Sequence, residues 1–391
     1  MNSLPIRVAV RAHSKAHKSG HVAQIQTALD GCIGVCAQKL CEAEAMVEAD
    51  IEDILISNQI AVSPFKTARL TALLKRAISR GKTKKMSVCV DAAEQIRELG
   101  IASANSEFPG GVGAMIELDV GHNRCGVDTA EQCLELCSAI EDTHGVYFAG
   151  LQAYHGLIQH VRDSGERARM SKEICEKVIS VKKFLSQNGF VVPLVTGAGT
   201  GSFLLEGASG VYDEVQPGSY IWMDVDYGRN PDTKMLFQPS LFIASTVMST
   251  AAGGSAKVVL DAGMKAIDFV SGPPRLAAIA RGNSVQWLTD EEADTYMCEN
   301  GGDEHCILTH TRNTTAATSS SSPTASSLSL LQLGDTVLLI PGHCDPQVGL
   351  YDFFSVLCPA ASIQTEREGE GGAEGLLELE AVWKISRSVG F

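Results

Sequence analysis

The sequence contains no apolar run long enough to cross a bilayer, which excludes a helical membrane span within it. Positive charge is also scarce, because 32 Lys and Arg stand against 46 Asp and Glu, for a formal net charge of −14. Broad nucleic-acid binding needs a basic face, so we expect neither a nucleic-acid nor a membrane partner. A chain of 391 residues is too long for one small core and predicts two domains.

The twelve cysteines lack any CxxC pair or other paired spacing. Several lie inside apolar segments, such as Cys32 and Cys36 in GCIGVC and Cys89 in MSVCVD. This pattern indicates buried free thiols in a reducing compartment rather than a disulfide framework. We therefore expect a soluble intracellular protein of the cytoplasm.

Acidic residues are absent from the start of the chain until Asp30, whereas His13, Lys15, His17 and Lys18 are concentrated there. Such a basic start is typical of a targeting peptide. It is equally typical of a strand that ends in a reactive lysine. Removal of a targeting peptide would discard Lys15. The choice between the two interpretations therefore depends on whether the rest of the sequence requires a reactive lysine.

Short apolar runs rich in β-branched residues alternate with helical segments up to Met223. One helix is signalled by Ser63 and Pro64 at its start and Gly81 past its end, and another by Asp128 as cap with Glu131 in a capping box. The predicted strands are Ile6–Val10, Ile33–Cys36, Ile54–Ile56, Met86–Val90, Met115–Val120, Tyr147–Ala153, Val191–Val195 and Glu214–Met223. This alternation predicts an α/β fold with a closed (β/α)8 TIM-type barrel, and an open doubly wound sheet is the alternative.

The sequence pattern changes near Pro239. After this residue, helical periodicity is nearly absent and short strand-like runs follow one another. We expect a barrel domain over 1–238 and a smaller all-β domain over 239–391. The Ser/Thr-rich insertion near 311–330 cannot bury enough apolar surface to order itself, so a disordered loop is expected there. The glycine-rich, acidic EREGEGGAEG is expected to form another loop.

Polar residues follow the carboxyl ends of the predicted strands, where the active sites of such barrels lie. Seven corresponding strand ends carry such residues, which suggests a single site. These residues are Lys15, Asn58, Asp91, Arg124, the group Tyr154, His155 and His160, the run TGAGTGSF at 196–203, and Tyr220.

The run TGAGTGSF has glycines at 197, 199 and 201, which let backbone N–H groups approach an anion at a helix start. It is not a P-loop, because no GK[ST] follows, and Ser202 stands where the dinucleotide fingerprint needs its third glycine. A phosphate monoester suits the turn, and a plain tight turn is the alternative.

A phosphate turn on one strand and a lysine on another fit pyridoxal phosphate (PLP), held at both ends. Lys15 would form a Schiff base with the cofactor's aldehyde, and the cations His13, His17 and Lys18 would lower the pKa of its amine. For a single lysine the alternative is an exposed surface charge.

The run LLIPGHCDPQ places His343 and Asp345 two residues apart on a loop after a predicted strand. In an extended segment, residues i and i+2 point the same way, so both side chains can reach one cation while Cys344 points away. A nitrogen and a carboxylate oxygen suit Mn²⁺ or Mg²⁺, with Zn²⁺ as a further choice. HxD pairs are also common by chance.

Several collinear motifs resemble the D-threonine aldolases, members of the alanine racemase-like (fold type III) PLP enzymes, which also hold the metal-dependent D-serine dehydratases. They are RAHSKAHK, GVCAQKLCEAEA, EDILISN, ELDVGHNRCGV, GLQAYHG, VTGAGTGSF, EVQPGSYIWMDVDY and PGHCDP. The resemblance covers nearly the whole chain and implies a (β/α)8 barrel followed by a β domain, usually as a homodimer.

The resemblance also implies roles for individual residues. Lys15 carries the cofactor, Arg124 lies near its phenolic oxygen, Tyr154 beside its ring, and Gly199 and Thr200 on its phosphate. The full expected cofactor set is Lys15, Arg124, Tyr154, Thr196, Gly197, Gly199, Thr200, Gly201 and Tyr220. His343 and Asp345 match the family's metal pair, and His160, in preference to His155, resembles the histidine near the substrate hydroxyl.

The sequence departs from the family at Ala12, where proline is usual, and at Ala198, where glycine is usual. Neither change removes a reacting group. Relatives commonly carry a further segment before the lysine loop, whereas this sequence begins almost at that loop. We expect the segment to have been trimmed or its strand to come from elsewhere.

The activity implied is a PLP- and metal-dependent retro-aldol cleavage of D-threonine and related D-3-hydroxy amino acids to glycine and an aldehyde. A D-serine or 3-hydroxyaspartate dehydratase on the same scaffold is one alternative, although such enzymes tend to have HxC where this chain has His343-Cys344-Asp345. A non-catalytic PLP-binding barrel protein is another, but those proteins lack a β domain.

Overall fold

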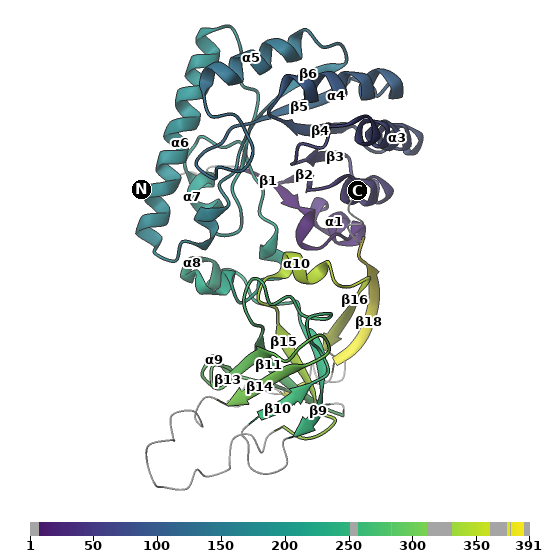
Figure 1. Cartoon of the computed structure of the whole chain (residues 1–391), viewed down its shortest axis with the longest axis vertical. Coiled ribbons are helices and arrows are strands. Elements are labelled where there is room, and N and C mark those ends of the chain that lie inside the picture. Colours follow the sequence, from purple (N-terminus) through teal and green to yellow (C-terminus); the bar gives the residue numbers. More distant parts are fainter. Residues whose placement is uncertain are drawn as a thin grey trace. The chain divides into compact units, whose positions relative to one another are not determined.

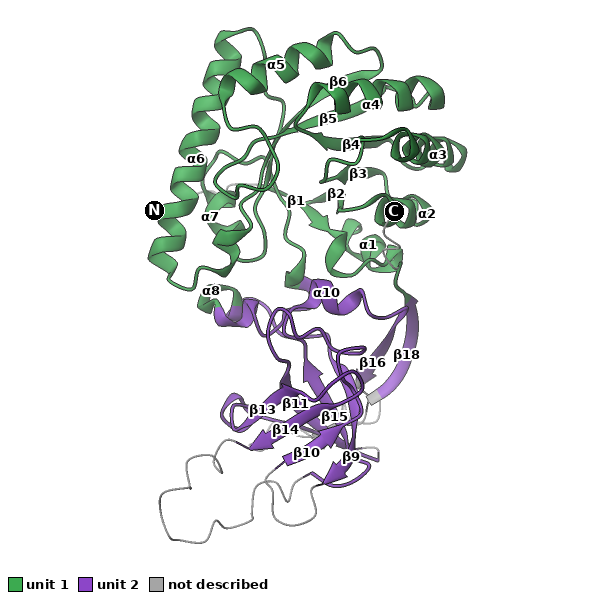
Figure 2. Ribbon diagram, in the orientation of Figure 1, with its two compact units in different colours: residues 1–220, 230–233, 384–391 green, residues 221–229, 234–383 purple. Residues whose placement is uncertain are grey.

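The computed structural model describes residues 8–250, 257–282, 284–310, 331–359, 374–375 and 377–386. The chain forms two compact units, shown in different colours in Figure 2. The first comprises 1–220, 230–233 and 384–391, and the second 221–229 and 234–383. Residues 6–7 of the first predicted strand, the predicted loop at 311–330 and most of EREGEGGAEG lie outside the described residues.

The first unit contains a closed barrel of eight parallel strands in the order β1 to β8, with helices around it (Figure 1). The predicted α/β barrel is therefore confirmed. Its strands are β1 (Ala9–His13), β2 (Cys32–Ala37), β3 (Asp53–Ile56), β4 (Lys85–Val90), β5 (Val112–Glu117), β6 (Val146–Ala153), β7 (Val195–Gly197) and β8 (Glu214–Val215).

The connecting helices follow from local capping and from apolar faces turned to the strands. α3 begins after Ser63, whose side chain accepts the Lys66 amide, and ends at Gly81 in a left-handed conformation, as predicted. The helices of the barrel are α1 (Gly20–Thr27), α2 (Leu40–Glu48), α3 (Pro64–Arg80), α4 (Ala93–Ser106), α5 (Ala130–Glu141), α6 (Ser164–Gln187) and α7 (Phe203–Ala208).

Several local predictions were wrong. β1 ends at His13 instead of Val10, and β5 covers 112–117 instead of 115–120. The cap of α5 is Thr129, not Asp128, because the Thr129 hydroxyl accepts the Gln132 amide and Gln132, rather than Glu131, completes the capping box. β7 covers 195–197 instead of 191–195, and β8 covers only 214–215 instead of 214–223. Both predicted runs contain a proline, which lacks the N–H that a central strand donates.

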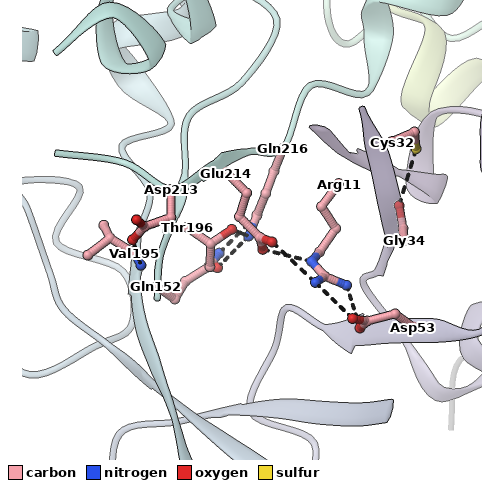
Figure 3. Close-up of polar contacts among 10 residues, drawn as sticks. All are labelled: Arg11, Cys32, Gly34, Asp53, Gln152, Val195, Thr196, Asp213, Glu214 and Gln216. Carbon is pink, nitrogen blue, oxygen red and sulfur yellow. Dashed lines mark hydrogen bonds and ion pairs between the residues drawn. The ribbon is translucent and has the colours of Figure 1, made fainter. Parts of the chain in front are cut away.

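The interior of the barrel holds a buried ion triad beside its apolar core (Figure 3). Arg11 on β1 donates from Nε to Glu214 on β8 at 2.7 Å and from Nη1 to Asp53 on β3 at 2.7 Å. Burial by itself would lower the pKa of Arg11, but the charges of Glu214 and Asp53 outweigh it and raise that pKa. The triad therefore links β1 to β8 where the barrel closes.

The second unit is built on an antiparallel sheet of eight strands in the order β13-β14-β10-β9-β15-β11-β12-β17, with β16 and β18 pairing separately. The smaller β domain of the fold prediction is confirmed. The strands are β9 (Ile243–Thr250), β10 (Lys257–Leu260), β11 (Arg275–Arg281), β12 (Ser284–Trp287), β13 (Tyr296–Asn300), β14 (Cys306–His310), β15 (Thr336–Ile340), β16 (Phe353–Pro359), β17 (Glu374–Gly375) and β18 (Leu377–Lys384). Its short helices are α9 (Asp290–Ala293) and α10 (Cys344–Val348), whereas α8 (Pro231–Lys234) lies mostly in the first unit.

None of the twelve cysteines forms a disulfide, and eight of them are buried. Within the described residues, no helix combines the length and the hydropathy that a bilayer span needs. Ser386 donates its amide to the carbonyl of Lys18 at 2.7 Å, so the segment after β18 returns to the lysine loop of the first unit.

Candidate active site

Lys15 lies half-buried in a short 3-10 helix, η1 (Ser14–Ala16), directly after β1. His13 caps this helix, because its Nδ1 accepts the Lys15 amide at 3.4 Å. The Nε2 of His13 lies 3.0 Å from Oγ of Ser57, the residue after β3. The His13 amide donates to Pro217, which follows β8. Contacts from two other strand ends thus fix the lysine at the carboxyl end of the barrel.

The residues around Lys15 are held by local hydrogen bonds. His17 is fully buried, and its Nδ1 accepts the Ser19 amide at 3.1 Å. His13, in its capping role, also presents Nδ1 as the acceptor. Lys18 is the cation next to Lys15, and its Nζ donates to the Lys15 carbonyl at 2.8 Å.

The glycine-containing turn lies between β7 and α7. Ala198 adopts φ 63°, a left-handed conformation that strains a residue with a Cβ and explains the family's preference for glycine here. Thr200 accepts the Tyr220 amide on its Oγ1 at 3.1 Å, and Tyr220 lies in η3 (Ser219–Ile221). The Tyr220 hydroxyl accepts from Gln26 at 3.0 Å. The structure therefore brings Thr200 and Tyr220 together.

Gln159, which sequence reasoning missed, organises this turn from a second short helix, η2 (Leu157–His160). Its Oε1 accepts the Gly201 amide at 2.8 Å, and its Nε2 donates to Ser202 Oγ at 2.7 Å and to the His155 carbonyl at 3.2 Å. A Cβ at Gly199 would lie 2.7 Å from Oε1 of Gln159. Contact with the Gln159 side chain is thus a reason for glycine at position 199, besides close approach to an anion. The Gly201 amide already donates to Gln159.

The other two predicted residues of the turn lie within β7 rather than in the loop. Thr196 is fully buried in the barrel, and its Oγ1 accepts from Gln216 at 2.6 Å, as Figure 3 shows. Gln216 also donates to Gln152 on β6 at 2.7 Å. A Cβ at Gly197 would lie 2.2 Å from the Ala153 carbonyl oxygen, so close backbone packing requires that glycine.

Arg124 and Tyr154 lie on the loops after β5 and β6 and contact each other. The guanidinium carbon of Arg124 is 5.9 Å from the centroid of the Tyr154 ring, within cation–π range. The His122 ring meets the same tyrosine edge-on at 6.2 Å. The structure thus joins these two predicted cofactor residues in one cluster.

The two candidate base histidines differ in their surroundings. His155 is buried, and its Nδ1 accepts the Ile158 amide at 3.3 Å. Burial lowers the pKa of His155, and its ring stacks on His122 at 5.9 Å. His160, the last residue of η2, is exposed.

Polar atoms without a partner among the described residues lie next to the predicted cofactor residues. The hydroxyl of Ser14 and Oε1 of Gln59 are both buried and unsatisfied. Gln59 donates its amide to Glu117 at the end of β5, and burial raises the pKa of Glu117, opposed by that hydrogen bond and by the charge of Arg124. Buried polar atoms normally find partners, so this end of the barrel suits a polar ligand such as PLP.

His343 and Asp345 lie at the start of α10 in the second unit. His343 is the residue before the helix, and its Nε2 lies 3.8 Å from Oδ2 of Asp345. The extended geometry assumed from the sequence is wrong, because the helix begins at Cys344. Cys344 does not point away as expected, since its Sγ lies 3.4 Å from Oδ1 of Asp345. Asp224, which sequence reasoning also missed, forms with His343 and Cys344 a group whose candidate ligand atoms lie within 4.8 Å of one another. Nitrogen and carboxylate donors fit a divalent cation.

Comparisons with known proteins extend over both units. The model "Alanine racemase, N-terminal domain" matches residues 2–226, and the model "Putative serine dehydratase domain" matches 240–357. A D-threonine aldolase of Arthrobacter sp is 38% identical over 380 residues, which cover 97% of this chain and 85% of the relative. A 3-hydroxy-D-aspartate aldolase of Paracoccus denitrificans (strain Pd 1222) is 33% identical over 350 residues, covering 88% and 80%.

Solved structures of related enzymes also match the chain over nearly its whole length. The crystal structure of D-threonine aldolase from Filomicrobium marinum matches with a TM-score of 0.79 and 33% identity, covering 99% of this chain and 89% of that one. D-threo-3-hydroxyaspartate dehydratase from Delftia sp. HT23 matches with a TM-score of 0.75 at 19% identity, covering 97% and 91%, and so shares the fold.

A closed parallel barrel with a lysine loop after its first strand, joined to an antiparallel β domain, defines a class of two-domain enzymes with an alanine racemase-type barrel. This chain belongs to that alanine racemase-like family and, within it, to the D-threonine aldolases, which are carbon–carbon lyases.

Proposed function

We propose that the chain is a PLP- and divalent-metal-dependent aldolase that cleaves D-threonine and related D-3-hydroxy amino acids to glycine and an aldehyde. The proposal rests on one observation: the same chain has a lysine fixed at the end of β1 and a histidine–carboxylate pair at the start of α10. The names of the relatives support the substrate class, since both aldolases act on D-amino acids with a 3-hydroxyl group.

The cofactor residues belong to the first unit. Lys15 would hold the aldehyde carbon of PLP, and the turn at Gly199 and Thr200 would hold the phosphate through the Thr200 hydroxyl. Arg124 and Tyr154, already in contact, would flank the ring. Tyr220 would support the phosphate end through its bond to Thr200. Bound PLP supplies the electron sink that makes cleavage of the Cα–Cβ bond possible.

His160 is the proposed base. It takes the proton from the 3-hydroxyl group of the substrate, so that this oxygen becomes the carbonyl of the aldehyde as the Cα–Cβ bond breaks. Uptake of a proton at Cα then gives glycine. The exposure of His160, and the burial of His155 with its Nδ1 engaged by the Ile158 amide, support this assignment. His155 then serves to hold the loop after β6.

The metal residues belong to the second unit. His343 and Asp345 would hold Mn²⁺ or Mg²⁺, with Zn²⁺ as the alternative, because a carboxylate favours harder cations than a thiolate does. A metal bound there supplies a Lewis acid that lowers the pKa of a hydroxyl group. The two side chains leave most coordination positions for water and substrate.

A product assay with and without a chelator tests the proposal. D-threonine should give glycine and acetaldehyde, EDTA should stop the reaction, and added Mn²⁺ should restore it. Full activity in EDTA would contradict the metal role. Release of ammonia and a keto acid from D-serine, with no cleavage of D-threonine, would favour the dehydratase alternative, which the second domain's match supports.

Two further expectations complete the proposal. A homodimer is supported by the exposed apolar side chains of the β16–β18 sheet, where Phe353 and Leu379 are 57% and 61% exposed. Light scattering should then give twice the mass of the chain. The unpaired cysteines support a reducing compartment such as the cytoplasm.

A further inference from the structure

The carboxylate of Asp224 accepts hydrogen bonds from the loop that holds His343. Its Oδ2 accepts from His343 Nδ1 at 2.8 Å and from the Cys344 amide at 2.9 Å, while its Oδ1 accepts the Tyr227 amide at 2.8 Å. The Asp224 side chain is completely buried. A buried carboxylate with three donors is a strong organising group, because each bond is charge-assisted.

The backbone around Asp224 is fastened to the same loop. The amides of Val225 and Asp226 donate to the carbonyls of Pro341 and Gly342 at 3.0 and 3.1 Å. Met223, immediately before Asp224, is buried and adopts a left-handed φ of 47°. Such a conformation persists only where the surrounding structure imposes it, so the position of Asp224 is fixed from both sides.

This arrangement determines which nitrogen of His343 can bind a metal. An ionised carboxylate only accepts hydrogen bonds, so the proton of the neutral ring lies on Nδ1. A metal held by His343 therefore binds Nε2, the nitrogen that lies 3.8 Å from Oδ2 of Asp345. Carboxylates in this relation to a ligating histidine orient the ring and raise its basicity.

Asp224 could instead be a direct ligand, since its oxygen, His343 and Cys344 form a compact group. Its hydrogen bonds argue against that role, because Oδ2 already accepts from two donors. We infer that Asp224 is a positioning residue that sets the tautomer and direction of His343 for a divalent cation shared with Asp345. This inference rests on the metal pair of the proposed function.

Titration of the metal-free protein with Mn²⁺ alone, followed by the electron paramagnetic resonance signal of the free ion, tests the inference independently of activity. Asp224→Asn should raise the dissociation constant for Mn²⁺ about 10-fold and Asp224→Ala about 100-fold. His343→Ala should abolish binding. Asp335→Asn is the matched control, because Asp335 is a buried carboxylate at the opposite end of β15 that pairs with Arg281. It should lose stability and keep Mn²⁺ affinity.

Each remaining outcome overturns the inference in a distinguishable way. If wild type binds Mn²⁺, His343→Ala does not, and both Asp224 variants bind as wild type, only the positioning role fails. If Asp224→Asn abolishes binding as completely as His343→Ala, Asp224 is a ligand. If wild type binds no Mn²⁺, the metal pair fails and the inference with it. Circular dichroism of Asp224→Asn establishes that the variant is folded.

Discussion

The two units hold their candidate chemistry in different ways. In the barrel, the Lys15 loop is fixed from several distant places in the chain, including Ser57 after β3, Pro217 after β8 and Ser386 near the C-terminus. In the second unit, the hydrogen bonds of His343 Nδ1 and of the Cys344 amide converge on one buried carboxylate, Asp224. Support from distant parts of the chain should tolerate the loss of one contact better than support that converges on one group.

The largest expected effect is the loss of activity in two variants that separate cofactor binding from metal binding. Lys15→Ala and His343→Ala should each reduce cleavage of D-threonine to background, because each removes one essential group. The binding measurements should diverge: Lys15→Ala should keep Mn²⁺ affinity, and His343→Ala should keep the absorbance of bound PLP. Loss of both ligands in either variant would contradict the assignment of one chemistry to each unit.

The ion triad of the barrel gives the next effect. Arg11→Met should destabilise the protein by about 3–5 kcal/mol, because it leaves Glu214 buried without its partner. Urea unfolding measures this free energy. Arg69→Met is the control, since the Arg69–Glu44 pair is partly exposed on the outer helices and should contribute about 1 kcal/mol or less. Equal losses in the two variants would contradict a special role for the triad.

Glu206 on α7 should make stability fall as pH rises. The carboxyl is buried, its Oε2 has no partner among the described residues, and burial raises its pKa from 4.5 to about 7. The folded state thus keeps the proton that the unfolded chain releases, so stability is full below pH 4.5 and declines up to about pH 7. The loss amounts to about 3 kcal/mol.

Glu206→Gln should remove this dependence, because glutamine carries no titrating proton. Urea unfolding at pH 5 and pH 8 compares the variant with wild type, and the variant's advantage should grow by about 2.5 kcal/mol between them. Parallel pH profiles for the two proteins would show that Glu206 is not protonated in the fold.

The smallest effect concerns the turn that Gln159 supports. Gln159→Met removes three hydrogen bonds and should weaken PLP binding about 10-fold, equivalent to about 1.4 kcal/mol, measured by absorbance titration of the cofactor-free protein. Gln95→Met is the matched control, because Gln95 makes three similar bonds in the β4–α4 loop. If both variants bind PLP equally well, Gln159 has no particular role at the turn.

The sequence was sufficient for the fold because apolar runs and capped helices carry local signals. Ser63, Pro64 and Gly81 marked α3 correctly. The seventh and eighth strands were misplaced, because Pro193 and Pro217 interrupt runs that otherwise look apolar, and the hydrogen bonds that define such short strands come from distant neighbours.

The candidate site was predictable only where residues lie in compact motifs. Lys15, the turn at 196–203 and the pair His343–Asp345 have such motifs. Asp224 lies 119 residues from His343, so no spacing could connect them, although the two acids of MDVDY near a predicted strand end were a visible signal. Gln159 had none, because its role depends on Gly201 and Ser202, which lie far along the chain.

The most direct test of the account is to trap the cofactor on the lysine. Protein reconstituted with PLP should absorb in the visible region, and borohydride reduction followed by peptide mass spectrometry should find the pyridoxyl group on Lys15. A label on the neighbouring Lys18, or no label at all, would contradict the account.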